Sequence, residues 1–461
     1  MTMQTLLKKH FYNLIKQIVC STMLFVLSMY SFNIYSQEIN KDVQLLERDE
    51  WQKEFLNLFD QKRYEDSIKF AIRIVEITEQ TYGKENFKLI TPLNNLASAY
   101  YMVDDFDQSQ AIFERCIKLI ELNQNIISPE LIVPLYGFGL TLNRFEEYAK
   151  ATNIFERALR INHVNNGFYN LEQLKIHDSL TESYIGLRNF EKANHHQKFQ
   201  VYVNKNHFGI SNPMVDESLT KLAKWYKRSG QIYSEREIHK ELLERQSNRN
   251  EQNLGQLIET YKNLSFSHRR EGMDIYQSLS PLKKALKIIN SNTETDLYLK
   301  LEVLLDLGDT YSSFGRAESA KKIYLDCWSL IEEDQNIESI VKNQFSKPIK
   351  VRNVMIPKQY PIKASDDDNQ MYETGYIAIE YSVNTEGNTE NIEIIESQPK
   401  QLIDKIAISA IRNTIYRPVY IEGIPQEKPN MLIRHEFSYP IKNEENLEPK
   451  EKDKPLNNPI A

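Results

Sequence analysis

The chain has 461 residues and a formal net charge of −7 at pH 7, with 57 Lys and Arg against 64 Asp and Glu. Charges of both signs are mixed along it, so it lacks the basic stripe that a nucleic-acid surface requires. A chain of this length is expected to form two or more structural units rather than one core. Its 14 glycines are few for a loop-rich α/β enzyme, so helices should dominate.

The first 36 residues have the composition of an export signal. A basic start that includes Lys8, Lys9 and Lys16 precedes an apolar run from Ile18 to Phe32, and Ser36 follows. This order is typical of a secretory signal peptide, and we expect cleavage after Ser36. The alternative is an uncleaved membrane anchor over residues 11–36, since about 18 to 20 apolar residues can just span a bilayer. The protein is predicted to be exported, with membrane contact only if this segment is retained.

From residue 45 onward a helix-turn-helix pattern recurs along most of the chain. The last large residue of the first helix in each copy is Leu58, Tyr100, Leu142, Tyr184, Tyr226, His268 and Tyr311. Five intervals between these residues are 42 residues long and the last is 43. Self-similarity of this length indicates a repeat solenoid, in which each unit buries its apolar face against its neighbours. We therefore predict an all-α solenoid of about seven repeats over residues 45–346.

Each copy resembles the tetratricopeptide repeat, with the pattern large-x-x-large-small-x-x-Tyr, a turn, and Tyr/Phe-x-x-Ala-x-x-x-Phe/Tyr-x-x-Ala. Small residues such as Ala97, Gly139 and Gly308 stand where two helices must approach closely. The 42-residue period is longer than the usual period of about 34 and resembles the kinesin-light-chain type of repeat. The resemblance covers about residues 50–333.

The resemblance implies that the first helices line a concave groove that binds a peptide or another protein. The expected groove positions are the polar residues between the packing ones, namely Asn94, Asn95, Lys221, Lys224, Lys227 and Asp306. An ordinary solvated helix surface is an equally good interpretation of each residue taken alone.

After a closing helix expected over Ile337–Phe345, Pro348 ends the helical pattern and a different domain is predicted over residues 347–440. Residues Tyr376–Val383 alternate with period two, as in a strand with one buried face. A hairpin turn at Asn384–Asn388, a return strand through Ile392 and Ile394, a helix opening at Pro399 and a last strand complete the domain. That strand places Met431, Ile433, His435, Phe437 and Tyr439 on one face. We predict a small α+β domain with a helix on one side of an antiparallel sheet, followed by a disordered polar tail over residues 441–461.

The same residues resemble the C-terminal domain of TonB, the periplasmic part of the energy transducer for outer-membrane transport. The matching features are Tyr360-Pro361-x-x-Ala364, Gly375, Val383-x-x-x-Gly387, Ile392-x-Ile394, Ser397-x-Pro399 and Ala410-x-Arg412-x-x-x-Tyr416-x-Pro418. The resemblance implies a periplasmic location and a sheet edge that accepts an extended peptide by strand addition. The implied contact residues are Met431, Ile433, Arg434 and Phe437.

Two departures from TonB count against energy transduction. No histidine lies within residues 11–36, whereas the TonB anchor carries a Ser and a His on one helical face. The long proline-rich spacer of TonB is also missing, and repeats stand in its place.

No catalytic, cofactor or metal constellation is found in the sequence. Gly137-Phe138-Gly139 lacks the remainder of a phosphate loop, and the adjacent His195 and His196 diverge on a helix. Buried packing is the better interpretation of His177, His239, His268, His435, Cys116 and Cys327, and a solvated loop is the better interpretation of Asp366-Asp367-Asp368. We therefore predict a protein that is not an enzyme and holds no cofactor.

The combined prediction is an exported adaptor that binds one protein through its repeats and an envelope protein through its TonB-like domain. In its sharper form the protein acts in energy-coupled transport across the outer membrane, with an outer-membrane transporter as partner. The alternative is a periplasmic scaffold of an envelope assembly that transduces no energy.

Overall fold

The computed structural model describes residues 43–249, 252–292, 296–360 and 371–441. The predicted signal segment over residues 1–36, the acidic run Asp366-Asp367-Asp368 and the predicted tail beyond residue 441 lie outside these ranges. Contacts divide the chain into two compact units, Met1–Leu222 and Ala223–Ala461, and each is described by itself.

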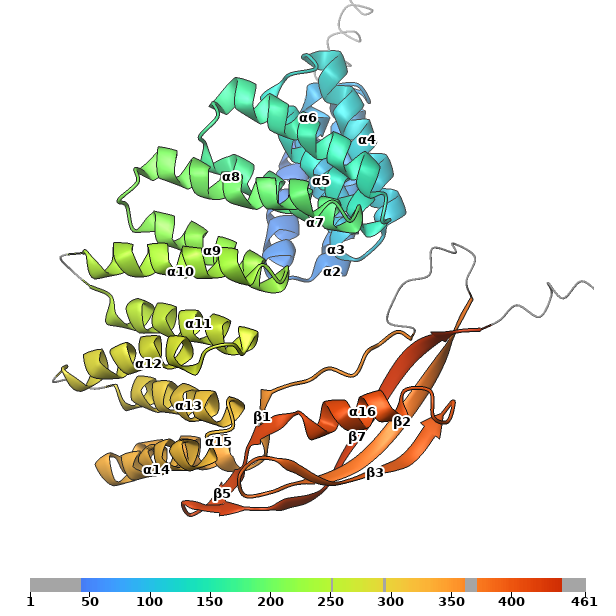
Figure 1. Ribbon diagram of the computed structural model, residues 1–461. Coiled ribbons are helices and arrows are strands. Elements are labelled where there is room, and N and C mark those ends of the chain that lie inside the picture. Colours follow the sequence, from blue (N-terminus) through green and yellow to red (C-terminus); the bar gives the residue numbers. More distant parts are fainter. Residues whose placement is uncertain (1–42, 250–251, 293–295, 361–370, 442–461) are drawn as a thin grey trace, which may run out of the picture. The chain divides into compact units, whose positions relative to one another are not determined.

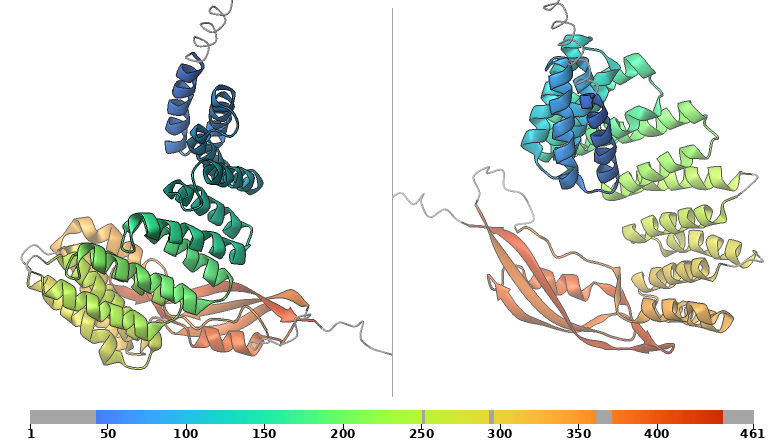
Figure 2. Two further views of the ribbon diagram at one scale, coloured as in Figure 1. Left: turned by 90° about the horizontal axis from the view of Figure 1, so that it is seen from above. Right: turned by 180° about the vertical axis from the view of Figure 1, so that it is seen from behind.

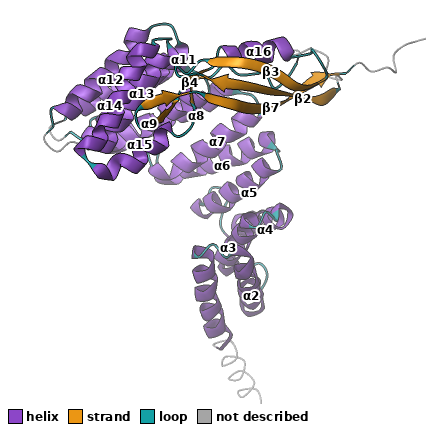
Figure 3. Ribbon diagram, turned by 90° about the horizontal axis from the view of Figure 1, so that it is seen from below, coloured by secondary structure: helices purple, strands orange, loops and turns teal. Residues whose placement is uncertain are grey.

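Helix pairs follow one another through the described chain up to Glu333, and all described strands come later (Figures 1 and 3). Residues 43–60 are helical and precede α2 (Tyr64–Tyr82). The following helices are α3 (Ile90–Met102), α4 (Phe106–Asn123), α5 (Ile132–Arg144), α6 (Tyr148–Asn166), α7 (Leu174–Gly186), α8 (Phe190–Phe208), α9 (Met214–Arg228), α10 (Ile232–Ser247), α11 (Leu254–Glu271), α12 (Ile275–Asn290), α13 (Leu297–Ser313) and α14 (Ala317–Glu333). Odd-numbered helices are the first of each pair, and α15 (Glu338–Phe345) follows the last pair.

Large and small side chains alternate between the helices of these pairs. The ring of Phe155 on α6 packs against Gly139 on α5, where an added Cβ would lie 2.5 Å from the ring. Tyr324 on α14 packs in the same way on Gly308 of α13, at 2.3 Å. Close approach of the two helices therefore requires glycine at these positions, as the repeat pattern predicted.

Successive repeats of the first unit are also joined at their loops. The Asn123 side chain at the end of α4 donates to the Glu85 carbonyl of the preceding loop at 2.8 Å. Asn165, 42 residues later, donates in the same way to the Ile127 carbonyl at 3.0 Å. Each loop is thus fixed by the helix pair that follows it.

The described part of the C-terminal domain contains three small antiparallel sheets. Its elements are β1 (Ile349–Arg352), β2 (Tyr372–Val383), β3 (Thr389–Gln398), α16 (Asp404–Arg412), β4 (Ile415–Arg417), β5 (Val419–Ile421), β6 (Ile424–Gln426) and β7 (Lys428–Pro440). The main sheet has the order β3-β2-β7, while β1 pairs with β4 and β5 pairs with β6. Helix α16 lies against one face of the main sheet (Figures 1 and 2). The core between them contains Ile377, Ile379, Tyr381, Val383, Ile403, Ala407, Ala410, Ile411, Tyr416 and Phe437.

Two details of this domain differ from the prediction. The helix begins at Asp404 and not at Pro399, because Gln401 has a φ of 66°, which a right-handed helix does not accommodate. The short strands β1, β4, β5 and β6 were not predicted, since three or four residues are too few for a period to be recognised.

Candidate peptide-binding surfaces

Strand β7 lies at an edge of the main sheet and has unpaired backbone groups. The N–H of Ser438 donates to the Lys358 carbonyl at 2.8 Å, and the Tyr360 N–H donates to the Ser438 carbonyl at 2.7 Å, so both groups of Ser438 point away from β2. Backbone groups of alternate strand residues point to the same side. Those of Leu432, Arg434 and Glu436 therefore also point away from β2, and no described segment pairs with them. We call these three residues the free edge of β7.

The residues expected at this edge divide between the two faces of the sheet. Met431 and Ile433 are half-buried against the core, and Phe437 is 2% exposed within it. Their backbones pair with β2, as the Ile379–Ile433 register shows. Arg434 lies on the other face, with its guanidinium 4.1 Å from the centre of the Tyr376 ring. Only Arg434 among the four thus belongs to the free edge.

Sequence reasoning missed Leu432 and Glu436, which complete the free edge. Leu432 is 67% exposed, on the sheet face away from the core. The period-two pattern places these side chains on the face away from the core, but which backbone groups face away from β2 depends on the side on which β2 pairs, which the pattern does not give.

One end of the β7 edge is occupied by the chain itself. Gln359 forms a parallel bridge with Ser438, and the His435 ring donates from Nε2 to the Pro357 carbonyl at 2.9 Å. Ile356, in the same segment, is buried in the sheet core. An added strand would therefore pair with the free edge and end before Ser438.

In the first unit, the expected groove residues lie on first helices. Asn94 and Asn95 are half-buried on α3, and the Asn94 side-chain oxygen is buried without a hydrogen-bond partner in the described chain. The Lys221 ammonium on α9 donates to Asp178 on α7 at 2.6 Å and to Gln200 at 2.8 Å. Lys221 therefore ties two successive first helices together.

In the second unit, two of the expected groove residues contact the neighbouring first helix and one does not. Lys227 lies with its Nζ 4.5 Å from the centre of the Phe266 ring on α11. Asp306 on α13 lies 3.8 Å from the Arg269 guanidinium on α11, and burial raises the pKa of the Asp306 carboxyl to about 6 against the opposing effect of Arg269. Lys224 is exposed and has no ion-pair or hydrogen-bond partner in the described part of the chain.

The histidines and cysteines for which packing was predicted are buried or half-buried. His177 and His239 are buried, His268 and His435 are half-buried, and Cys116 and Cys327 are buried free thiols. Burial raises the pKa of the Cys116 thiol to about 12. Within the described ranges, no group of three His, Cys, Asp or Glu side chains could hold a metal ion. No helix in those ranges is both long and apolar enough to cross a bilayer.

The fold is that of a helical-repeat protein whose last repeat is followed by a small α+β domain with a partly free edge strand. Family models identify both parts. Tetratricopeptide repeat models match residues 56–122 and 301–334, and the model described as "Gram-negative bacterial TonB protein C-terminal" matches residues 357–437. The chain thus combines tetratricopeptide repeats with a TonB C-terminal domain, which confirms both resemblances.

Among solved structures, the repeat region is similar to kinesin-light-chain repeat proteins. The crystal structure of a putative kinesin light chain with nearly identical TPR-like repeats from Podosopora anserina is 14% identical, with a TM-score of 0.39; the match covers 44% of this chain and 97% of that one. BtubC (BKLC) from P. vanneervenii is 19% identical, with a TM-score of 0.37; that match covers 50% of this chain and 93% of that one. No curated protein sequence matches the chain.

Both families are interaction modules rather than catalysts. Tetratricopeptide repeats bind proteins, and the TonB C-terminal domain is typical of cell-envelope proteins. The chain is accordingly a protein-binding component associated with the cell envelope.

Proposed function

We propose that this protein is an exported adaptor that holds one protein in the groove of its repeats and an extended segment of an envelope protein at β7. The observation that carries the proposal is the free edge of β7, where no described segment pairs with the outward backbone groups of Leu432, Arg434 and Glu436. A partner strand would satisfy these groups by β-augmentation. The sharper form of the proposal is a role in energy-coupled transport across the outer membrane, with an outer-membrane transporter as the partner.

Strand addition at the free edge can be tested by a substitution that removes an outward backbone donor and leaves the pairing of β7 with β2 unchanged. Arg434→Pro removes one outward N–H and leaves the bonds between β7 and β2 intact, because the Arg434 N–H faces away from β2. Arg434→Ala is the matched control, since it removes the same side chain and retains the N–H. The full chain is used as bait on the detergent-solubilised envelope fraction of the native cells.

We expect the parent protein and Arg434→Ala to capture outer-membrane transporters and Arg434→Pro to lose them at unchanged thermal stability. Equal capture by all three proteins would eliminate strand addition. Capture of other envelope proteins, again lost in Arg434→Pro, would instead favour the non-transducing periplasmic scaffold.

The repeat groove is tested at Lys224, whose side chain is exposed and has no ion-pair or hydrogen-bond partner among the described residues. A partner captured by the repeats should be lost on Lys224→Glu, while the Arg434→Pro variant still captures it. Lys221→Gln is a poor substitute for this test, because it also breaks the contacts with Asp178 and Gln200.

The fate of residues 1–36 decides between the two proposed locations. N-terminal sequencing that finds Gln37 at the start of the mature protein supports a free periplasmic protein. An intact N-terminus in the inner-membrane fraction supports the anchor over residues 11–36 and the transducing form of the proposal.

A further inference from the structure

The TonB C-terminal domain contacts α13, α14 and α15 through its short strands, and β4 provides the buried ion pair of this contact. Arg417 on β4 forms two parallel hydrogen bonds with Asp309 on α13, from Nε to Oδ1 and from Nη2 to Oδ2, each at 2.8 Å. The side chains of Arg417 and Asp309 are only 6% and 9% exposed. Asp309 lies one helical turn after Asp306, which faces Arg269 of the neighbouring first helix α11. The contact therefore uses the row of first helices that would otherwise line the groove.

The remaining polar groups around this ion pair are satisfied. The Tyr324 hydroxyl on α14 donates to Asp309 Oδ1 at 2.9 Å, and Arg417 Nη1 donates to the Gln344 carbonyl at 3.2 Å. Breaking one partner of a buried, fully hydrogen-bonded pair leaves an uncompensated charge. The geometry is therefore that of a fixed contact rather than a transient one.

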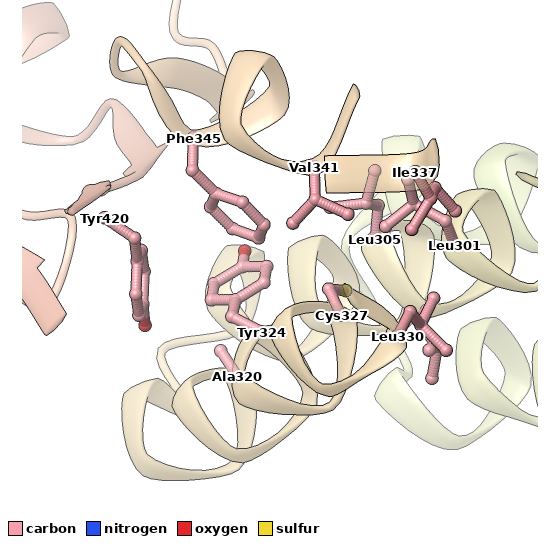
Figure 4. Close-up of a cluster of buried hydrophobic side chains, with 11 residues drawn as sticks. Leu301, Leu305, Ala320, Tyr324, Cys327, Leu330, Ile337, Val341, Phe345 and Tyr420 are labelled. Carbon is pink, nitrogen blue, oxygen red and sulfur yellow. The ribbon is translucent and has the colours of Figure 1, made fainter. Parts of the chain in front are cut away.

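Further contacts on both sides of β4 extend this joint. The Ser312 hydroxyl on α13 donates to the Tyr416 carbonyl at 3.3 Å, and Arg352 Nη1 on β1 donates to the Ser313 carbonyl at 3.1 Å. Beyond β4, Tyr420 on β5 enters the core of the last repeat, with ring centres 5.8 Å from Tyr324 and 5.1 Å from Phe345 (Figure 4).

Strand β4 also belongs to the core of the main sheet. The side chain of Tyr416, next to Arg417, lies in that core, and its hydroxyl is 2.7 Å from the Tyr381 hydroxyl on β2. Tyr381 is paired with Met431 on β7. A continuous series of contacts thus runs from β7 through β2 and β4 to α13. The covalent connection is short as well, since α15 ends at Phe345 and β1 begins at Ile349.

We propose that the TonB C-terminal domain is the repeats' own terminal ligand, held on α13 by Arg417, so that the β7 edge and the last repeats form one rigid body. The joint closes the groove at the last repeat and passes a load on β7 directly into the helices. A flexible spacer between a peptide-binding domain and the rest of a protein would not do this. The transfer of a pulling force from β7 to the helices rests on the proposed strand addition at β7. The existence of the rigid joint does not depend on that proposal.

Distance measurements between spin labels test the rigid joint. The labels are attached to cysteines that replace the exposed Lys322 on α14 and Glu393 on β3 of the full chain, away from the free edge. Cys20, the one native cysteine besides the buried Cys116 and Cys327, is replaced by Ser so that it takes up no label. We expect one narrow distance distribution in the parent protein and a broadened one in Asp309→Ala. Arg417→Lys should give intermediate broadening, because it keeps the charge but loses the two parallel hydrogen bonds. The control is Lys342→Gln, which removes the exposed Lys342–Glu338 pair on α15 and should leave the distribution narrow.

Three results would overturn the proposal. A broad distribution in the parent protein would show that the domain is not fixed, whether or not the variants fold. A narrow distribution in a folded Asp309→Ala variant, with helical content unchanged by circular dichroism, would show that the ion pair does not hold the joint. Equal broadening in Lys342→Gln would show that the loss of an exposed ion pair releases the domain as readily, so the Arg417–Asp309 pair has no special role in holding it. Failure of strand addition is detected separately, because Arg434→Pro alters capture and not the label distance, whereas Asp309→Ala alters the distance and not capture.

Discussion

Acidification to pH 5 is expected to destabilise the fourth helix pair, α7 and α8, because two histidines are held neutral there. His177 Nδ1 lies 2.9 Å from His196 Nδ1, so one ring donates to the other, and the bond is lost once both Nδ1 atoms carry a proton. Burial, and then the neighbouring His196, lowers the pKa of His177 to about 3. Burial, and then His195, lowers the pKa of His196 to about 4.

The sign and size of the effect follow from proton linkage. Both pKa values lie below the ordinary value of about 6.5, so the unfolded chain takes up protons first as the pH falls, and stability is lost from about pH 6.5 downward. At pH 5 the folded pair is still almost entirely neutral, and protonation stabilises the unfolded state by about 2 kcal/mol for each histidine. The expected loss of opening free energy between pH 7 and pH 5 is thus about 4 kcal/mol for the two histidines together.

Hydrogen exchange of the α7 and α8 amides in the full chain, corrected for the intrinsic pH dependence, measures this loss. The double variant His177→Gln/His196→Gln keeps polar side chains of similar length and cannot titrate, so it should lose much less protection than the parent between the two pH values. Equal losses in the parent and the double variant would refute the reasoning, as would imidazole pKa values near 6.5 measured by NMR.

Three further predictions concern packing, backbone geometry and buried charge. Phe155→Ala should lower the unfolding free energy by about 3–5 kcal/mol. Gly139→Ala should be harmful alone, because its Cβ meets the Phe155 ring at 2.5 Å, but tolerated in a protein that already carries Phe155→Ala. Additive losses of unfolding free energy in denaturant titrations would contradict this. Gly387→Ala should destabilise the C-terminal domain by about 2 kcal/mol or more, because Gly387 has a φ of +87° and an added Cβ would lie 1.9 Å from the Tyr416 carbonyl oxygen; an unchanged melting temperature would disprove it. Burial raises the pKa of Asp306 to about 6, so the folded state takes up a proton before the unfolded state as the pH falls. The parent protein should therefore gain stability between pH 7 and pH 4, and Asp306→Asn should lack this gain. Parallel profiles of stability against pH in the two proteins would exclude this effect of Asp306.

The features predicted correctly from the sequence are those that leave a repeating pattern of residue types along the chain. The 42-residue period was recognisable because each repeat buries the same positions, such as Phe155 against Gly139. The strands β2 and β7 were recognisable because alternate residues enter one core. Such patterns reflect local geometry, which every copy or every second residue repeats.

The joint between the domains could not be predicted in this way. Arg417 and Asp309 are 108 positions apart, and neither stands out in its own segment: Arg417 is the variable residue of Tyr416-x-Pro418, and Asp309 is one more acidic residue on a helix. A pair of this kind is specified by how two domains meet, and one sequence contains no record of that. The same limit applies to the free edge, where the strand was predicted correctly and the side of the strand was not.

The groove residues illustrate why polarity alone does not identify a binding site in a repeat protein. Lys221 pairs with Asp178, and Arg269 lies beside Asp306, so these charges connect successive first helices and stabilise the stacking of repeats. Lys224 stands on the same helix as Lys221, one turn further on, and has no such partner in the described chain. Because a charge already paired within the protein must lose that partner before it can bind another, the unpaired Lys224 can contribute to binding at a lower cost in stability. We therefore expect specificity in this groove to come from the few polar positions that the stacking of repeats leaves unused, and a scan of the groove should begin with them.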